Sequence, residues 1–315
     1  MDVGVIGVGH LGYHHARVYA ELPGVRLVGV SDIDEERMTK AASDFRTKGF
    51  SDYELLLDKV DVVSVAVPTS LHHGVGKRCL EAGVHVLMEK PLCADLPEAE
   101  ELVSIAADKG LVLQVGHIER FNGAVRKLSE VVRNPRFIEC HRMSPYPSRG
   151  DDVGVVLDLM IHDIDIVLSL VKAPVAQFEA IGVPVFSSHE DIANARLKFK
   201  NGCVANLTAS RVSIERMRKL RVFEPDAYIS VRYDDQELKR YRRRTNMIEQ
   251  GMDPMSCIDI EIIPVGREEP LRAELVSFIH SVETGEPPTV SGVDGRDALK
   301  LALKITDEIK RLLPS

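Results

Sequence analysis

Short apolar runs alternate with longer amphipathic segments along the first part of the chain. The runs cover residues 3–6, 27–31, 62–67, 85–88 and 111–115. Between them, apolar residues recur every three or four positions, as in 96–106, which is the spacing of a helix. Strands joined by helices of this length predict a parallel sheet that is covered by helices on both faces.

The pattern changes after about residue 135, where one strongly apolar helix at 155–171 precedes strands with alternating polarity. Residues 195–200 and 203–209 alternate on either side of Asn201 and Gly202, which predicts a hairpin. Alternation between 220 and 231 predicts further strands, and a periodic segment from about 294 to 313 predicts a closing helix. We therefore expect two domains, 1–122 with a doubly wound parallel sheet and 123–315 with an antiparallel sheet.

Composition narrows the class of protein. The 315 residues are 44% hydrophobic and 28% charged, as in an ordinary soluble protein, and no apolar run approaches the length of a membrane span. The N-terminus shows no signal-peptide pattern. With 40 basic and 48 acidic residues the net charge is −8, which argues against nucleic acid or a membrane as partner. Five cysteines without a CxxC pair favour free thiols in a reducing cytoplasm.

A glycine-rich segment, Gly7-Val8-Gly9-His10-Leu11-Gly12, joins the first strand to the first helix. Gly7 suits a tight turn, Gly9 lets the backbone approach a pyrophosphate, and Gly12 permits close packing of helix on strand. Asp32 follows at the end of the second strand, where a carboxylate binds ribose hydroxyls and repels a 2′-phosphate. The pattern predicts a Rossmann site for NAD rather than NADP, with Gly7, Gly9, His10, Leu11, Gly12 and Asp32 at the cofactor.

Two further strand ends carry candidate site residues. Pro68 and Thr69 close the third strand, at the edge where open α/β sheets bind ligands. His72 follows, either as a cofactor contact or as a surface helix residue. Glu89 and Lys90 end the fourth strand, where a partly desolvated lysine is suited to proton transfer or to polarising a hydroxyl.

The apolar helix at 155–171 carries a polar stripe of four residues at spacings of four, three and four: Asp158, His162, Asp165 and Ser169. A carboxylate one turn from a histidine fixes the imidazole tautomer and raises its basicity, which suits a general base. The alternative is a polar network that ties the two domains together. Without an HExxH motif or a cysteine cluster, we expect no metal site.

Together, the glycine segment, Asp32, Glu89-Lys90-Pro91 and Asp158-xxx-His162 resemble the Gfo/Idh/MocA family of nicotinamide-dependent sugar oxidoreductases. The resemblance covers essentially the whole chain. It implies a Rossmann domain followed by an α/β domain with an open antiparallel sheet, through which the chains form dimers or tetramers. It also implies that Lys90, Asp158 and His162 are catalytic, with His162 as base, and that the Lys90–Pro91 bond is cis.

The segment His117-Ile118-Glu119-Arg120-Phe121-Asn122 is similar to one found in family members that act on nucleotide sugars. This similarity implies that His117, Arg120 and Asn122 face the sugar or the cofactor. The most similar members oxidise the C3 hydroxyl of UDP-N-acetylglucosamine to a ketone, which a partner aminotransferase converts to a 3-amino sugar for lipid A. Oxidation of a free polyol such as inositol, or NAD sensing without catalysis, are the alternatives.

A diphosphate in the substrate calls for cationic side chains. Arg149 precedes the apolar helix, and basic clusters occur at 211–221 and 239–244. Arginine suits bidentate contacts to phosphate, although each cluster also fits a solvated strand face. We therefore expect Arg149 at the substrate and leave the roles of the two clusters open.

Overall fold

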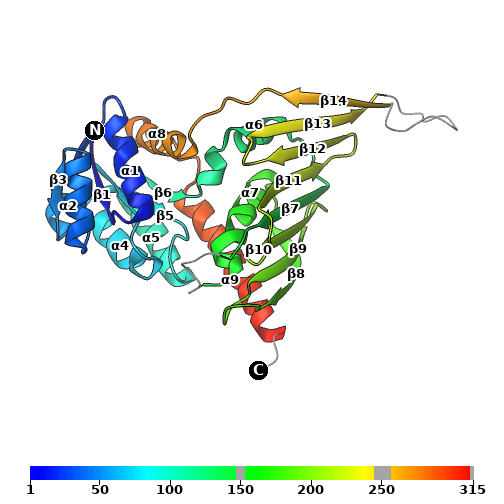
Figure 1. Cartoon of the computed structure of the whole chain (residues 1–315), viewed down its shortest axis with the longest axis horizontal. Coiled ribbons are helices and arrows are strands. Elements are labelled where there is room, and N and C mark those ends of the chain that lie inside the picture. The colour runs from blue at the N-terminus through cyan, green and yellow to red at the C-terminus, as the bar shows by residue number, and fades with distance from the viewer. Residues whose placement is uncertain (147–152, 245–256, 313–315) are drawn as a thin grey trace. The chain divides into compact units, whose positions relative to one another are not determined.

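The computed structural model describes residues 1–146, 153–244 and 257–312, and the chain divides into two compact units (Figure 1). The first unit consists of Met1–Phe121 together with Glu269–Lys300. The second consists of Asn122–Glu268 together with the C-terminal residues from Leu301. Residues 269–300 thus belong to the first unit, although they follow the second sheet in the chain. The predicted single boundary at residue 122 places them in the second domain instead.

The first unit contains a parallel sheet of six strands in the order β3-β2-β1-β4-β5-β6. The strands are β1 (Asp2–Ile6), β2 (Arg26–Ser31), β3 (Lys48–Phe50), β4 (Val62–Val65), β5 (His85–Glu89) and β6 (Leu113–Gly116). This order is that of the doubly wound dinucleotide-binding fold, and it confirms the parallel sheet predicted from the alternating pattern. Only β3 was not predicted, because three residues are too few to show a period.

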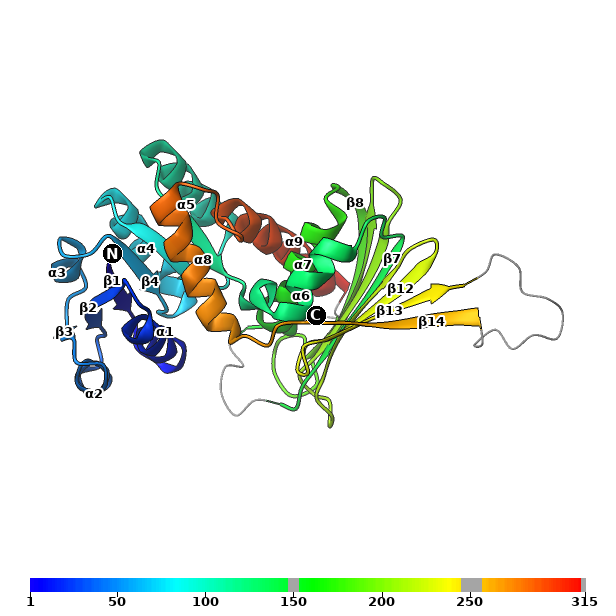
Figure 2. The same ribbon diagram turned by 90° about the horizontal axis from the view of Figure 1, so that it is seen from above.

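Helices flank this sheet, and Figure 2 shows α1 and α4 on opposite sides of it. The elements of the first unit are α1 (His10–Glu21), α2 (Glu35–Asp44), α3 (Glu54–Leu57), η1 (Thr69–Leu71), α4 (His72–Glu81), α5 (Leu96–Lys109), η2 (Ile118–Phe121) and α8 (Pro270–Thr284). Leu275, Phe278 and Ile279 of α8 lie in the same apolar core as Val3 and Val5 of β1. Burial of these side chains is the physical reason why α8 belongs to the first unit.

The second unit contains a sheet of eight strands in the order β14-β13-β12-β11-β7-β10-β9-β8 (Figure 1). All neighbours pair antiparallel except β7 and β10, which run parallel in register, so the predicted antiparallel sheet is present in a mostly antiparallel form. The strands are β7 (Phe137–Met143), β8 (Val175–Val183), β9 (Ile192–Phe199), β10 (Val204–Ser210), β11 (Met217–Phe223), β12 (Ala227–Arg232), β13 (Glu237–Arg243) and β14 (Ile258–Ile263).

The predicted hairpin is confirmed as β9 and β10, with Gly202 at φ +84° in the turn. Figure 2 shows α6 (Gly123–Val131) and α7 (Ile161–Val171) on one face of the sheet. A π-helix, η3 (Val156–Met160), leads directly into α7, and the closing helix is α9 (Gly292–Leu312), which contributes residues to both units. On β7, β11, β12 and β13 a row of half-buried aromatic rings stacks across the strands, formed by Phe137, Phe223, Tyr228 and Tyr241.

Candidate cofactor and catalytic sites

The glycine segment between β1 and α1 forms a tight loop that only glycine permits at two positions. Gly7 has φ +84°, and a Cβ on it would lie 2.8 Å from the carbonyl oxygen of Ala66. A Cβ on Gly12 would lie 1.8 Å from the carbonyl oxygen of Gly7. No heavy atom lies within 4 Å of a Cβ built on Gly9, so its surface is open. The loop therefore forms an open cradle at the start of α1.

The N-terminus of α1 is suited to an anion. Gly9 is its N-cap residue, no side chain caps the helix, and its first turn carries no acidic residue. The N–H groups of a helix's first turn have no partners within the helix, and the helix dipole favours negative charge there. These features fit the pyrophosphate of a dinucleotide.

Asp32, at the end of β2, is fixed against this loop. One carboxylate oxygen accepts a hydrogen bond from the Val8 N–H at 2.7 Å, and the other accepts one from the Asp34 N–H at 2.9 Å. The loop is also tied to the end of β2 by a bond from the Gly7 N–H to the Ser31 carbonyl at 2.7 Å. Asp32 is thereby held where a carboxylate binds the adenosine ribose in dinucleotide folds.

A cavity of about 700 Å³ opens beside the loop within the first unit. Of the predicted cofactor residues, Gly7, Gly9, His10, Leu11, Asp32 and Pro68 line it, whereas Gly12, Thr69, His72, Glu89 and Lys90 do not. Its lining also includes residues that no sequence motif indicates, namely Ile33, Arg37, Ser51, Tyr53, Ser70 and Leu71. Ser51 and Tyr53 lie in the segment that follows β3. Their place at the cavity could have been predicted only if that short strand had been recognised.

His72 is buried, which excludes the alternative of a surface helix residue. Its ring nitrogens lie 2.8 Å from the Pro91 carbonyl oxygen and 3.0 Å from the Val67 carbonyl oxygen. Burial lowers the pKa of His72 although both carbonyls oppose this shift. The imidazole thus joins the segments that follow β4 and β5. The Lys90–Pro91 peptide bond, which directly follows Glu89 in the chain, is cis, as the resemblance implies.

Glu89, which precedes Lys90 in the chain, belongs to a cluster of buried ionisable groups. Glu89 contacts the His15 ring at 3.0 Å and accepts a hydrogen bond from the Lys90 N–H at 3.2 Å. Burial alone would raise the pKa of Glu89, but the bonds from His15 and Lys90 lower it below its usual value. Glu274 of α8 is fully buried, and neither of its carboxyl oxygens has a hydrogen-bond partner among the described residues. Burial and the nearby Glu89 raise the pKa of Glu274 well above its usual value.

The second unit carries the other two predicted catalytic residues. Asp158 lies in the π-helix η3 and His162 in the first turn of α7, and both are half-buried. π-Helical turns are rare and occur frequently at functional sites. The buried pair Arg142–Asp163, with contacts of 3.0 and 2.9 Å, ties the first turn of α7 to β7.

The segment from His117 to Asn122 is built into the protein interior at both ends. His117 is 1% exposed, and burial, followed by the charges of Lys90 and Arg120, lowers its pKa to about 3. Arg120 donates to the Thr289 carbonyl at 3.1 Å. The Asn122 amide caps α6 through the Ala124 N–H and donates to the Tyr233 carbonyl at 3.1 Å. These contacts give the segment a structural role whether or not it also binds substrate.

Several residues of the basic clusters in the second unit pair with carboxylates. Arg211 is completely buried against Asp191, at 2.7 Å. Ion pairs on the sheet join Arg221 to Glu139, Arg240 to Glu261 and Arg244 to Asp259. Arg149, the predicted substrate contact, lies outside the described residues. In the described ranges no three His, Cys, Asp or Glu side chains are grouped so as to hold a metal ion, and no helix is long and apolar enough to cross a membrane.

The fold and the glycine loop define the class of protein, and comparison with known families agrees with it. Residues 1–117 match the model of an oxidoreductase family with an NAD-binding Rossmann fold, and residues 122–229 match the GFO/IDH/MocA C-terminal domain. The chain therefore belongs to the Gfo/Idh/MocA family of oxidoreductases, and its cofactor is NAD.

Among individual proteins, the chain is 37% identical to UDP-N-acetylglucosamine 3-dehydrogenase of Acidithiobacillus ferrooxidans, over 99% of this chain and 98% of that protein. A solved structure of that enzyme has a TM-score of 0.93 and covers 100% of this chain and 99% of its own. Myo-inositol 2-dehydrogenase of Thermotoga maritima is 30% identical over 99% of this chain and 97% of its own length. By their names, both relatives are dehydrogenases, the first of UDP-N-acetylglucosamine and the second of myo-inositol.

Proposed function

We propose that this protein oxidises the C3 hydroxyl of UDP-N-acetylglucosamine to a ketone. The observation that carries the proposal is the similarity to the Acidithiobacillus enzyme, which extends through both domains at 37% identity. A match of this extent includes the second unit, which carries Asp158 and His162, and not only the widely shared dinucleotide fold.

The proposed roles follow from the requirements of alcohol oxidation. The hydroxyl must lose a proton to a base, and NAD supplies the hydride acceptor when bound. In our proposal His162 takes the proton, Asp158 holds the imidazole in the tautomer that accepts it, and Lys90 polarises the hydroxyl oxygen. Gly7, Gly9, Gly12 and Asp32 hold the dinucleotide, with support from His10, Leu11, Pro68 and Thr69.

Oxidation of a free polyol is the second candidate, because the Thermotoga myo-inositol 2-dehydrogenase also matches the whole chain. The identity is lower, 30% against 37%, which favours the nucleotide sugar. The paired arginines on the second sheet do not decide between the two substrates, because each one already faces a carboxylate.

An NADH-formation assay across UDP-sugars and free polyols distinguishes these candidates. The purified enzyme is mixed with NAD and each substrate, and the near-ultraviolet absorbance of NADH is followed, with glutamate and a coupling aminotransferase added to draw off the ketone. We expect turnover with UDP-N-acetylglucosamine. Turnover with inositol alone would show that the enzyme is a dehydrogenase of a free polyol. NAD binding without any turnover would indicate a non-catalytic sensor.

Variants then test the residue roles. His162→Ala is expected to bind NAD as the wild type does and to lose turnover. His280→Ala is the matched control, since His280 is 60% exposed on α8. Near-normal turnover by His162→Ala removes that residue from the mechanism. Lys90→Met, with NAD binding measured separately, tests the polarising role in the same way.

The proposal also covers the cellular setting. We infer a homodimer or homotetramer formed through the second sheet, supported by the row of stacked aromatic rings on it. Light scattering coupled to size exclusion measures this directly. A cytoplasmic location, an aminotransferase that uses the ketone and a place in lipid A synthesis follow from the same substrate assignment, as does a substrate contact for Arg149.

A further inference from the structure

The helix that carries Asp158 begins without a cap of its own. Its N-cap residue is Val155, whose side chain has no polar atom. Instead, Glu190 from the loop before β9 takes that place: its carbonyl oxygen accepts from the Val155 N–H at 2.9 Å, and its carboxylate oxygen lies 3.4 Å from the Val156 N–H. A distant residue therefore supplies the acceptors that a helix start requires.

Gly154 makes room for this arrangement. A Cβ at Gly154 would lie 1.9 Å from a carboxylate oxygen of Glu190 and 2.2 Å from its carboxyl carbon. Since Glu190 is only 2% exposed, its side chain has no solvent space to move into. The Gly154 carbonyl in turn accepts the hydrogen bond from the Asp158 N–H at 3.1 Å. The backbone from Gly154 to Val156 thus lies between Glu190 and Asp158: Glu190 accepts from the Val155 and Val156 N–H groups, and the Gly154 carbonyl accepts from Asp158.

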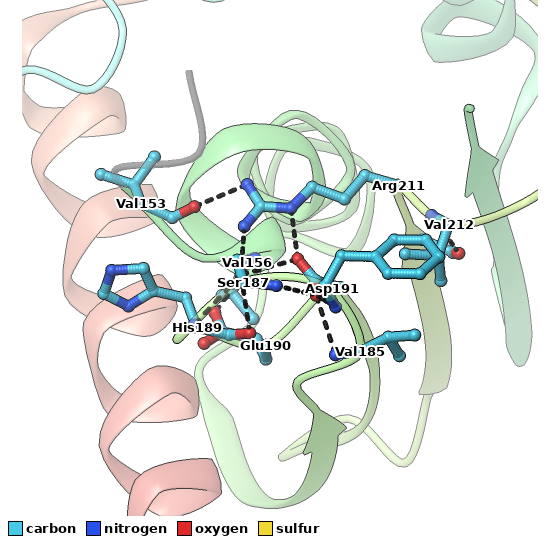
Figure 3. A network of polar contacts seen from close by, with 11 residues as sticks. Val153, Val156, Val185, Ser187, His189, Glu190, Asp191, Arg211 and Val212 are labelled. Carbon is cyan, nitrogen blue, oxygen red and sulfur yellow. Dashed lines mark hydrogen bonds and ion pairs between the residues drawn. The ribbon is translucent and has the colours of Figure 1, made fainter. Parts of the chain in front are cut away.

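Arg211 holds the same region from the other side (Figure 3). Its guanidinium donates to the Asp191 carboxylate at 2.7 Å, to the Val153 carbonyl at 2.7 Å and to the Ser187 hydroxyl at 2.9 Å. We call Ser187, Glu190, Asp191 and Arg211 the Arg211 network. It joins the end of β10, the loop before β9 and the approach to η3.

Asp191 completes the network with an unusual number of donors. Besides Arg211, its carboxylate accepts from the N–H groups of Val185, Phe186 and Ser187 at 2.8, 2.6 and 2.9 Å. Burial alone would raise the pKa of Asp191, but these donors hold it below its usual range. A buried, fully hydrogen-bonded ion pair adds little net stability compared with apolar packing, and its best attested use is to fix one geometry.

We propose that Glu190 and Arg211 are positioning residues of the oxidation, which fix the backbone at 153–156 so that Asp158 is held in its reactive orientation. Neither residue touches the reacting atoms in this proposal, and both act through Asp158. The inference rests on the proposed function, because it concerns a residue to which that function gives a role. Misplacement of a reactive group by about 1 Å is enough to lower turnover strongly.

Three variants test the contact made by Glu190. Glu190→Ala removes the carboxylate, Glu190→Gln keeps its size and one acceptor oxygen, and Glu283→Ala is the matched control at an exposed position of α8. We expect Glu190→Ala to lower kcat about 10- to 100-fold with an unchanged KM for NAD. Glu190→Gln should restore most of kcat, and Glu283→Ala should equal the wild type.

A double-mutant cycle separates positioning from a purely structural role. If Glu190 acts through Asp158, then Glu190→Ala has little further effect on kcat in an Asp158→Asn background. Additive effects of the two substitutions overturn the proposal, as does wild-type kcat in folded Glu190→Ala. If Glu190→Ala does not fold, Gly154→Ala displaces the same carboxylate without removing it and is expected to lower kcat in the same way.

Hydrogen exchange gives a readout that does not depend on activity. In Glu190→Ala the amides of Val155, Val156 and Asp158 should exchange faster than in Glu283→Ala, while those of the last turn of α7 exchange at the same rate. Equal exchange at these three amides refutes the positioning role. Faster exchange in a protein that oxidises no member of the panel would place the failure in the proposed function and not in the Arg211 network.

Discussion

Replacing Gly12 by alanine is expected to damage the cofactor loop and the fold together. The added Cβ would lie 1.8 Å from the Gly7 carbonyl oxygen. A carbon atom and a carbonyl oxygen approach no closer than about 3.3 Å, so the two backbone segments must separate by roughly 1.5 Å. Overpacking of this kind lowers the free energy of unfolding by about 1–3 kcal/mol. Because the displaced loop is also the proposed pyrophosphate site, NAD affinity should fall at least about tenfold, which corresponds to about 1.4 kcal/mol.

Gly9→Ala is the matched comparison, because it adds the same methyl group in open space. No heavy atom lies within 4 Å of that Cβ, and Gly9 has φ −63°, which alanine adopts without strain. The free energy of unfolding without cofactor should therefore stay unchanged or rise by about 0.4–1 kcal/mol. Gly9 nevertheless lines the cavity, so an added methyl group takes space there, and NAD affinity should again fall about tenfold or more.

Urea unfolding of the cofactor-free variants and calorimetric titration with NAD measure the two effects separately. The expected result is that Gly12→Ala loses both stability and affinity, whereas Gly9→Ala loses affinity alone. Normal NAD binding by Gly9→Ala would refute the assignment of this loop to the pyrophosphate. Unchanged stability of Gly12→Ala would refute the argument from close packing.

Three further variants test other parts of the structure. Asp32→Asn should reduce the preference for NAD over NADP about tenfold or more in binding titrations, because it removes the charge that repels a 2′-phosphate; an unchanged preference would remove Asp32 from cofactor selection. Arg142→Met should lower the free energy of unfolding by about 3–5 kcal/mol in urea, since it leaves Asp163 buried and unpaired, and adding Asp163→Leu should recover most of this loss. Burial and Glu89 raise the pKa of Glu274 above 4.5, so above this pH the folded chain keeps a proton that the unfolded chain releases. The contribution of this carboxyl to stability is therefore lost as the pH rises from 4.5 toward the raised pKa. Glu274→Gln should accordingly gain in melting temperature relative to the wild type as the pH rises above about 5, and a difference that does not change with pH would contradict a raised pKa of Glu274.

The parallel sheet was predictable because its strands are buried on both faces and appear as continuous apolar runs. The glycine loop and Asp32 were predictable for a different reason, since a tight turn and a close approach restrict the residue type at each position. The short strand β3 was not, because Lys48-Gly49-Phe50 contains only one large apolar residue. With β3 unrecognised, Ser51 and Tyr53 could not be assigned to the cavity that they line.

Partners that are distant in the sequence account for the other differences. Helix α8 belongs to the first unit because Leu275 and Phe278 enter the core around β1, and no local pattern records which sheet an amphipathic helix will cover. Arg211 was a candidate for phosphate binding on its charge alone, and its burial depends on Asp191, which lies in another loop. Periodicity predicts which face of an element is buried, but it does not identify the element that covers that face.

The two units hold their proposed site residues by different means, and this difference has a physical reason. In the first unit, the backbone itself positions the proposed site: glycines determine the shape of the loop, and the apolar strands hold the loop in place. In the second unit, Asp158 lies in η3 and His162 in the first turn of α7, so the start and rotation of these two consecutive helices must be fixed by side chains. Arg142–Asp163 ties the first turn of α7, and the Arg211 network ties the approach to η3. Apolar packing tolerates small rotations of a helix, whereas directional bonds to buried charges do not. The buried ion pairs that hold the approach to η3 and the first turn of α7 are therefore suited to keep the proposed base at one fixed angle.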